Sequence, residues 1–213
     1  MTRIFAIGDI HGCVDKLDAL LDSIDIDFTR DLLLFVGDYI DRGPNSFEVV
    51  DRLVTLKNQY ADRIITLKGN HEEMFLDYLS GADKISFMAN GGTATLESYQ
   101  RHQQPNDPSP VPADHLGFFQ SLALYYETDH YIFVHAGMKP RVSLQLQSPR
   151  DLLWIRHRFI RSGYDFGKIV IFGHTPFREP LLEPNKIGID TGAVYGRKLA
   201  CLRLPDYVFY FAQ

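Results

Sequence analysis

The stretch RIFAIGDIHG, residues 3–12, decides the fold, because a short apolar run in it is followed at once by a Gly-Asp pair and a histidine. Residues 3–7 are almost wholly apolar, which is typical of a strand covered on both faces of a sheet. The glycine lets the backbone turn sharply where the strand ends, so the aspartate and histidine begin a loop. The first unit predicted is therefore a buried strand that ends in residues able to bind a metal.

Four more motifs along the chain combine glycine with Asp, Asn or His in the same way. The five motifs are residues 8–12 (GDIHG), 37–43 (GDYIDRG), 69–72 (GNHE), 135–137 (HAG) and 173–175 (GHT). Four of them directly follow a short apolar run, and the third follows one after a single lysine. Open α/β sheets bind ligands outside the carboxyl ends of their strands. We therefore expect the five motifs to form one site.

Strands and helices alternate through the first 80 residues. Strands are predicted at residues 3–7, 32–36 and 64–67, and helices at 14–24, from 45 or 46 onward, and at 72–79. This βαβαβα order predicts a parallel core sheet. The later strands are predicted at residues 123–127, 131–134, 168–172, 186–189, 199–204 and 207–211, with a hairpin turn at 204–207. We expect a single α/β domain over residues 1–213, with two packed sheets and helices outside them.

The periodic pattern weakens between residues 80 and 116. Residues 100–114 contain four prolines among polar residues, which predicts a surface loop. The segment lies between the third and fourth motifs, where an insertion can cover a site. We therefore expect a cap or loop insertion at about 80–116, and we expect it to influence the choice of substrate.

Composition excludes several classes of protein. With 213 residues, 45% of them hydrophobic, the chain is long enough for one domain with a full core. Its formal net charge of −5 argues against general nucleic-acid binding, which requires neutralisation of phosphates. Cys13 and Cys201 have neither metal-binding nor redox spacing, which fits a reducing cytosol. The sequence shows no signal peptide and no membrane span, so we expect a cytoplasmic protein without nucleic-acid or membrane partners.

The motifs supply two carboxylates, three imidazoles and one amide oxygen as candidate metal ligands. These are Asp9, His11, Asp38, Asn70, His135 and His174. Nitrogen and oxygen ligands without thiolate suit Mn, Fe, Zn or Co. Six ligands exceed the four of a tetrahedral zinc site, so they suffice for two ions if one carboxylate, of which Asp38 is the natural candidate, bridges them.

Each motif taken alone is more often a turn, a cap or a structural histidine, so the inference rests on their joint occurrence. The remaining histidines lie in loop or polar helical contexts, and we expect them at the surface. They are His102, His115, His130 and His157.

The ordered motifs resemble the phosphoprotein phosphatase family of calcineurin-like metallophosphoesterases, most closely its bacterial and bacteriophage-lambda-type serine/threonine protein phosphatases. The resemblance runs from Gly8 to residues 189–193, with further shared landmarks at residues 90–92 and 153–156. It implies a four-layer α/β/β/α sandwich and two divalent metal ions, with Mn the leading candidate. It implies a first metal held by Asp9, His11 and Asp38. It implies a second held by Asp38, Asn70, His135 and His174.

The resemblance also implies how phosphate esters are hydrolysed. A hydroxide that bridges the metals attacks phosphorus in line, and His71, supported by Asp41, protonates the leaving oxygen. Arg42 and Arg156 would bind the phosphate oxygens. Arg158 is the rival of Arg156, and a solvated charged helix face at residues 156–158 is the alternative for both.

Several functions stay open at the level of sequence. The leading one is a serine/threonine protein phosphatase, with phosphotyrosine as a further substrate. A symmetrical dinucleoside tetraphosphate hydrolase is the second, although such enzymes typically depart from this pattern at Asp41 and Glu72. An inactive phosphoprotein-binding module is disfavoured because every expected ligand and the acid are in place. A nuclease is disfavoured by the acidic balance. The partner expected is therefore a phosphorylated protein or a small phosphoester, and Cys13 is not expected to act as a nucleophile.

Overall fold

The computed structural model describes residues 2–103 and 109–213, whose strands form two five-stranded sheets. The first sheet contains, in spatial order, β10 (Val208–Ala212), β9 (Leu199–Leu204), β1 (Ile4–Ile7), β2 (Leu32–Phe35) and β3 (Ile64–Thr66). The second contains β4 (Tyr125–Glu127), β5 (Tyr131–Val134), β6 (Ile169–Phe172), β8 (Lys186–Gly188) and β7 (Leu181–Glu183).

Each sheet has three parallel strands and two antiparallel ones. In the first, β1, β2 and β3 are parallel, and Ile7 pairs with Phe35, which pairs with Thr66. In the second, β5, β6 and β8 are parallel. Because the parallel strands end in register, the loops that follow them start side by side. The predicted parallel core is therefore confirmed, and β7 is a strand that the sequence pattern did not indicate.

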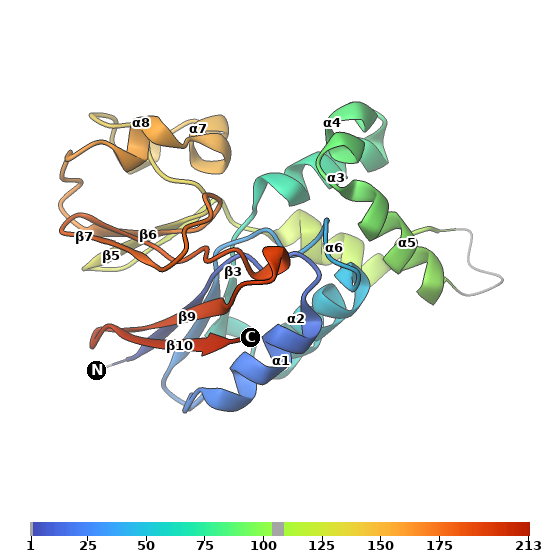
Figure 1. Cartoon of the computed structure of the whole chain (residues 1–213), viewed down its shortest axis with the longest axis horizontal. Helices are drawn as coiled ribbons and strands as arrows, with labels where there is room; N and C mark the ends of the chain where they lie inside the picture. The colour runs from blue at the N-terminus through green and yellow to red at the C-terminus, as the bar shows by residue number, and fades with distance from the viewer. Residues whose placement is uncertain (1, 104–108) are drawn as a thin grey trace.

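Helices cover the outer face of each sheet (Figure 1). The helices are α1 (Val14–Ser23), α2 (Ser46–Tyr60), α3 (Asn70–Ser80), α4 (Lys84–Ala89), α5 (Gly92–His102), α6 (Ala113–Ser121), α7 (Pro149–Trp154) and α8 (His157–Ile160). Of these, α4 and α5 pack mainly on α3 and α2 and extend beyond the sheets (Figure 1). Short 3₁₀ turns lie at Ala61–Arg63, Leu144–Leu146 and Ala193–Tyr195. None of the helices in the described ranges is long and apolar enough to cross a membrane.

Three apolar cores separate four layers. Alternate residues of a strand face opposite sides, so in β1 Phe5 and Ile7 pack toward the helices of the first sheet while Ile4 and Ala6 pack between the sheets. A third core joins the second sheet to α7 and α8 through residues such as Phe159. The expected α/β sandwich of two mixed sheets flanked by helices is confirmed.

The expectation of a surface loop at residues 100–114 is wrong at both ends. Residues 100–102 belong to α5 and residues 113–114 begin α6, while residues 104–108 lie outside the described part of the chain. Buried polar residues explain the error, because α5 buries Thr95 and Ser98 on its inner face. A helix whose buried face is partly polar has a weak hydrophobic period.

His115 is also placed wrongly by the sequence, since it is buried on α6 and not at the surface. Its Nδ1 lies 3.0 Å from the Tyr99 hydroxyl, and its ring packs on Phe47 with 4.7 Å between the centroids. Burial lowers the pKa of His115, which favours the neutral ring in this aromatic cluster. His102, His130 and His157 are exposed, as expected.

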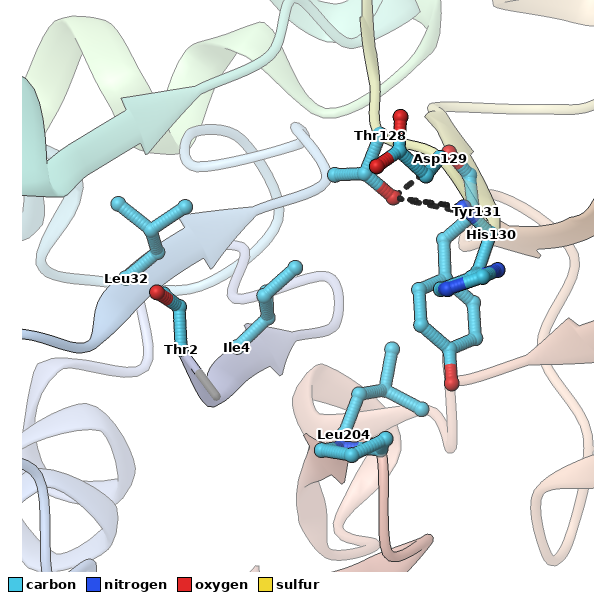
Figure 2. A pocket seen from close by; sticks show the side chains of 9 residues that line it. Thr2, Ile4, Leu32, Thr128, Asp129, His130, Tyr131 and Leu204 are labelled. Atoms are coloured by element: carbon cyan, nitrogen blue, oxygen red, sulfur yellow. Dashed lines mark hydrogen bonds between the residues drawn. The ribbon is translucent and has the colours of Figure 1, made fainter.

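A crevice of about 360 Å³ opens between the two sheets at the amino ends of their parallel strands. Figure 2 shows Ile4 and Leu32 on one side of it and Tyr131 on the other. Its lining is mostly apolar, and the five motifs lie at the other ends of the same strands. The crevice is therefore distinct from the candidate site described next.

Candidate metal centre

The five motifs meet at the carboxyl ends of β1, β2, β3, β5 and β6. The loop after β1 is joined to the loop after β2, because the amides of Ile10 and His11 donate to the Asp38 carbonyl at 3.0 and 2.9 Å. The second sheet joins through the amide of His174, which donates to both carboxylate oxygens of Asp9 at 3.1 and 2.9 Å. The structure therefore brings together motifs that are far apart in the sequence.

The loops hold several non-glycine residues in the left-handed region of backbone space. These are His11, Asp38, Asp41, Arg42 and His174, with φ between 48° and 72°. Such conformations are unfavourable for residues with a side chain and persist only where the surroundings enforce them. These unfavourable backbone conformations are concentrated at the strand ends. There the rest of the fold holds the side chains in position against the conformational preference of the backbone.

One group of candidate ligands contains His11, Asp38 and His71. The Nε2 atom of His11 lies 3.5 Å from Asp38 Oδ2, and that of His71 lies 4.0 Å from the same oxygen. Arg42 Nη1 donates to His11 Nε2 at 2.6 Å. The His11 and His71 rings therefore converge on the Oδ2 side of the Asp38 carboxylate, and Arg42 lies beside His11.

The other group contains Asp38, His135 and His174. His135 Nε2 lies 3.3 Å from Asp38 Oδ1, 3.0 Å from the Asn70 amide oxygen and 3.2 Å from His174 Nδ1. Asp38 thus offers one oxygen to each group. This is the placement that a bridging carboxylate requires.

The histidine tautomers are set by backbone carbonyls. His11 Nδ1 donates to the Ile40 carbonyl at 2.7 Å, and His135 Nδ1 donates to the Val36 carbonyl at 3.0 Å. This leaves a lone pair on the Nε2 atom of each neutral ring, as in metal-binding histidines. At His11 that lone pair accepts the hydrogen bond from Arg42, so a metal bound there would take the place of this contact. At His135 the Nε2 lone pair faces the oxygens of Asp38 and Asn70. All of these atoms are hydrogen-bond acceptors and repel one another, so the arrangement requires a cation or a proton between them.

A proton is disfavoured there by burial. Burial lowers the pKa of His135, that of His11 to about 3 and that of His174 to about 2. His174 Nε2 is also buried and has no hydrogen-bond partner within the described residues. Neutral, inward-facing imidazoles are the form that binds divalent metals.

The carboxylates of the site also require positive charge. Burial, with repulsion from Asp190 and Asp38, raises the pKa of Asp9. Burial likewise raises the pKa of Asp190 to about 6. The donor set of carboxylates, imidazoles and an amide oxygen thus fits two divalent ions. Asp9 itself lies at the edge of the centre, where its carboxylate binds the His174 amide, and it belongs to neither of the two ligand groups.

His71 is paired with Asp41 in the interior of the protein. His71 Nδ1 donates to Asp41 Oδ2 at 2.6 Å, and both side chains are at most 1% exposed. Burial opposes protonation of His71, but the carboxylates of Asp38 and Asp41 outweigh it, and its pKa is raised. The raised pKa favours the protonated ring, which is able to donate a proton.

A hydroxyl from α5 fixes the other oxygen of Asp41. Thr95 Oγ1 donates to Asp41 Oδ1 at 2.6 Å and accepts from the Asp41 amide at 2.9 Å. Sequence reasoning did not identify Thr95 as part of the site. Its position three residues after Gly92 of the 90–92 landmark was the one available signal.

Glu72 joins two of the loops. Its carboxylate accepts from the amides of Asp38, Tyr39 and Gly69 at 2.8 to 2.9 Å. Burial, followed by repulsion from Asp38, raises the pKa of Glu72 to about 7. The glutamate therefore holds the start of α3 against the loop that carries Asp38.

A small cavity of about 100 Å³ adjoins these residues. Its lining includes His11, Arg42, Arg156, His174, Asp190 and Tyr195. Arg158, the rival considered for Arg156, is not among the lining residues. The guanidinium of Arg42 lies 5.8 Å from the centre of the Tyr195 ring. The cavity thus carries two guanidinium groups beside the candidate ligands, a combination suited to phosphate.

Known proteins are similar to this chain in sequence and in fold. The family model described as Calcineurin-like phosphoesterase matches residues 2–210. Serine/threonine-protein phosphatase 1 of Salmonella typhimurium is 32% identical over 207 residues, covering 95% of this chain and 92% of the relative.

Two further similar proteins are described as acting on nucleotides. An asymmetrical bis(5'-nucleosyl)-tetraphosphatase, PrpE of Halalkalibacterium halodurans, is 28% identical over 231 residues, covering 95% of this chain and 90% of the relative. A crystal structure described as that of a candidate diadenosine tetraphosphatase superposes with a TM-score of 0.78 at 22% identity, covering 99% of this chain and 93% of the other. At that identity, the superposition shows a shared fold.

Proposed function

Because the chain belongs to the calcineurin-like phosphoesterase family, we propose that it is a metal-dependent serine/threonine protein phosphatase. The observation that carries the proposal is the buried His71–Asp41 pair, 2.6 Å apart. An alkoxide such as that of serine leaves phosphorus poorly and requires a proton, which a positioned imidazolium supplies. The Salmonella relative, a serine/threonine-protein phosphatase, supports the same function.

Different side chains have different roles in the proposed reaction. Arg42 and Arg156 bind the oxygens of the phosphate through their planar guanidinium groups. His71 gives its proton to the leaving oxygen, and Asp41 holds the ring and stabilises its charge. Two divalent metals, when bound by Asp9, His11, Asp38, Asn70, His135 and His174, supply Lewis acidity and activate water for attack on phosphorus. We propose Mn as the first choice, with Fe, Zn or Co as replacements, and the cytoplasm as the location.

A second candidate is hydrolysis of dinucleoside tetraphosphates. It is supported by the PrpE relatives, which are described as asymmetrical enzymes, whereas the alternative considered from the sequence is the symmetrical reaction. The two arginines of the cavity suit a polyphosphate as well as a phosphate ester.

The test compares turnover of the Mn-loaded protein on a phosphoserine peptide, a phosphotyrosine peptide and diadenosine tetraphosphate. We expect the phosphoserine peptide to give the highest kcat/KM. Dominant hydrolysis of the dinucleotide would replace the first proposal by the second. Metal binding without turnover of any of the three would favour a phosphoprotein-binding module.

A further inference from the structure

A positively charged pocket adjoins the active-site cavity. It has a volume of about 650 Å³, and its charged lining residues are Arg178, Glu179, Arg197 and Lys198. Two loops build both the pocket and the cavity. In one loop, Pro176 lines the cavity and Arg178 lines the pocket, and in the other Tyr195 lines the cavity and Gly196 the pocket. The same two loops therefore border both the cavity and the pocket.

The loop between the two spaces is held in place. The Lys16 ammonium of α1 donates to the carbonyls of Ala193 and Arg197. Arg197 Nη1 donates to the Phe177 carbonyl at 3.4 Å, which links the two loops. A methyl group added at Gly192 would lie 3.3 Å from Arg197 Cδ, so the arginine stem passes directly beside the cavity wall. The pocket is therefore preformed beside the cavity.

The side chains of this pocket carry a net positive charge. Its lining has three cationic side chains, one acidic side chain, Glu179, and Gln213, in a chain whose formal net charge is −5. Lys198 Nζ also lies 5.0 Å from the centre of the Phe211 ring. Arg178 is exposed, and within the described residues its guanidinium makes no hydrogen bond or ion pair. Such a local cationic surface attracts negatively charged ligand groups.

A second groove, of opposite charge, reaches the site from other elements. It has a volume of about 490 Å³ and is lined by Glu73, Asp77, Asp83, Arg150 and Trp154 among others. The Trp154 indole donates to Glu73 at 2.7 Å, and its ring lies 6.3 Å from that of His174. This groove belongs to α3, α4 and α7, and it shares no lining residue with the cationic pocket. The active site is thus flanked by surfaces of both signs.

The two signs identify the kind of substrate that fits. A nucleoside polyphosphate carries only negative charges, which the groove of Glu73, Asp77 and Asp83 would repel. A peptide is able to carry acidic residues on one side of its phosphorylated residue and neutral or basic residues on the other. The opposed charges therefore favour an extended peptide over a dinucleotide.

We propose that the pocket of Arg178, Arg197 and Lys198 is a specificity site that binds acidic residues on one side of the phosphorylated residue of a peptide substrate. Tyr195 lines the cavity beside Arg42, and the next residue, Gly196, lines the pocket, so the exposed Tyr195 side chain lies at the border of the two spaces. The proposal rests on the protein phosphatase function proposed above. It adds that the preferred substrate carries its negative charges on one flank only.

The experiment measures kcat/KM of the Mn-loaded enzyme on three phosphoserine peptides. They carry three glutamates before the phosphoserine, three glutamates after it, or alanine at all of these positions. Each value is divided by the kcat/KM for p-nitrophenyl phosphate, which removes any general loss of activity. The variants are Arg178→Glu and Arg178→Lys, with the distant, exposed Arg30→Glu as a control of equal charge change.

We expect one of the two acidic peptides to exceed the alanine peptide by about fivefold, as one or two partly exposed ion pairs allow. Arg178→Glu should remove that preference, mainly through KM, while Arg178→Lys and Arg30→Glu keep it. Added salt should reduce the preference in the wild-type enzyme.

Equal kcat/KM values for the three peptides would overturn the specificity site and leave the phosphatase function intact. A loss of preference in Arg30→Glu as large as that in Arg178→Glu would have the same meaning. If Arg178→Glu lowers turnover of diadenosine tetraphosphate but not of the acidic peptide, the occupant is a polyphosphate and the proposal is wrong. Hydrolysis of p-nitrophenyl phosphate with none of any phosphopeptide would overturn both proposals.

Discussion

The loops at the strand ends and the helical segment α4–α6 contribute to the same site in different ways. The loops carry the groups that do chemistry, and these groups lie within a few residues of one another in each motif. The helical segment carries groups that hold the loops. Thr95 binds Asp41 and the Gly91 carbonyl accepts the Arg42 amide at 3.1 Å, both across about fifty residues of sequence.

The difference shows that reactive groups lie close together in the sequence, whereas the residues that hold them in place are far away in the sequence. A motif is short because its functional side chains project from a single turn at the end of a strand. A support needs only one hydrogen bond at the right place, and any polar side chain on a nearby helix can provide it. Variants in the two regions should therefore differ both in size of effect and in the quantity affected.

The largest effect is expected at the shared ligand. Asp38→Asn removes the charge that faces both ligand groups. Metal affinity should fall by well over the roughly hundredfold typical of a lost supporting residue, and activity should fall with it. Metal content after dialysis and kcat at saturating Mn measure the two effects. Full metal content in this variant would show that the centre is not organised around Asp38.

A smaller and more selective effect is expected at the acid. His71→Asn should lower kcat on phosphoserine peptide by about 10²–10⁴-fold, the range of general acid catalysis. The loss on p-nitrophenyl phosphate should be much smaller, because nitrophenolate leaves without a proton. Parallel measurements on both esters test this. Equal losses would assign His71 to the metal centre, to which its 4.0 Å contact with Asp38 also brings it close.

A moderate effect is expected in the helical segment. Thr95→Val leaves one oxygen and the amide of Asp41 without this partner, and kcat should fall by about ten- to a hundredfold. Thr95→Ser keeps the hydroxyl and should restore most of the activity. A positioning role predicts a loss confined to substrates that need the acid, so the ratio of peptide to nitrophenyl ester turnover is the deciding measurement. A uniform loss on both esters would indicate a purely structural role.

The smallest effect is expected at a residue that adjoins the first motif without taking part in it. The pKa of the Cys13 thiol is raised by burial, which disfavours the reactive thiolate. Cys13→Ser should keep kcat within about twofold of wild type on both esters. A loss as large as that of Thr95→Val would mean that the loop after β1 depends on this side chain for its shape.

Sequence could predict the first three parallel strands, because buried strands have continuous apolar runs and end in motifs. It could also predict that Asp9, His11, Asp38, Asn70, His135 and His174 gather at one edge, since the motifs recur at strand ends. It could not predict α5, whose buried Thr95 and Ser98 make hydrogen bonds instead of apolar contacts. It could not place His115 either, since a ring buried among Phe47 and Tyr99 depends on helices distant in the chain.

The carboxylate of Glu72 has a consequence for the opening motions of the centre. It binds two amides of the loop after β2, those of Asp38 and Tyr39, and the Gly69 amide at the start of its own helix, so the loop after β2 cannot leave α3 without losing two hydrogen bonds at once. The amides of Asp38 and Tyr39 should therefore exchange with deuterium at one common rate, as members of a single cooperative opening unit. Metal would then enter and leave the centre only when this unit opens. The exchange rate of these amides would therefore measure how often the centre opens far enough to exchange its metal.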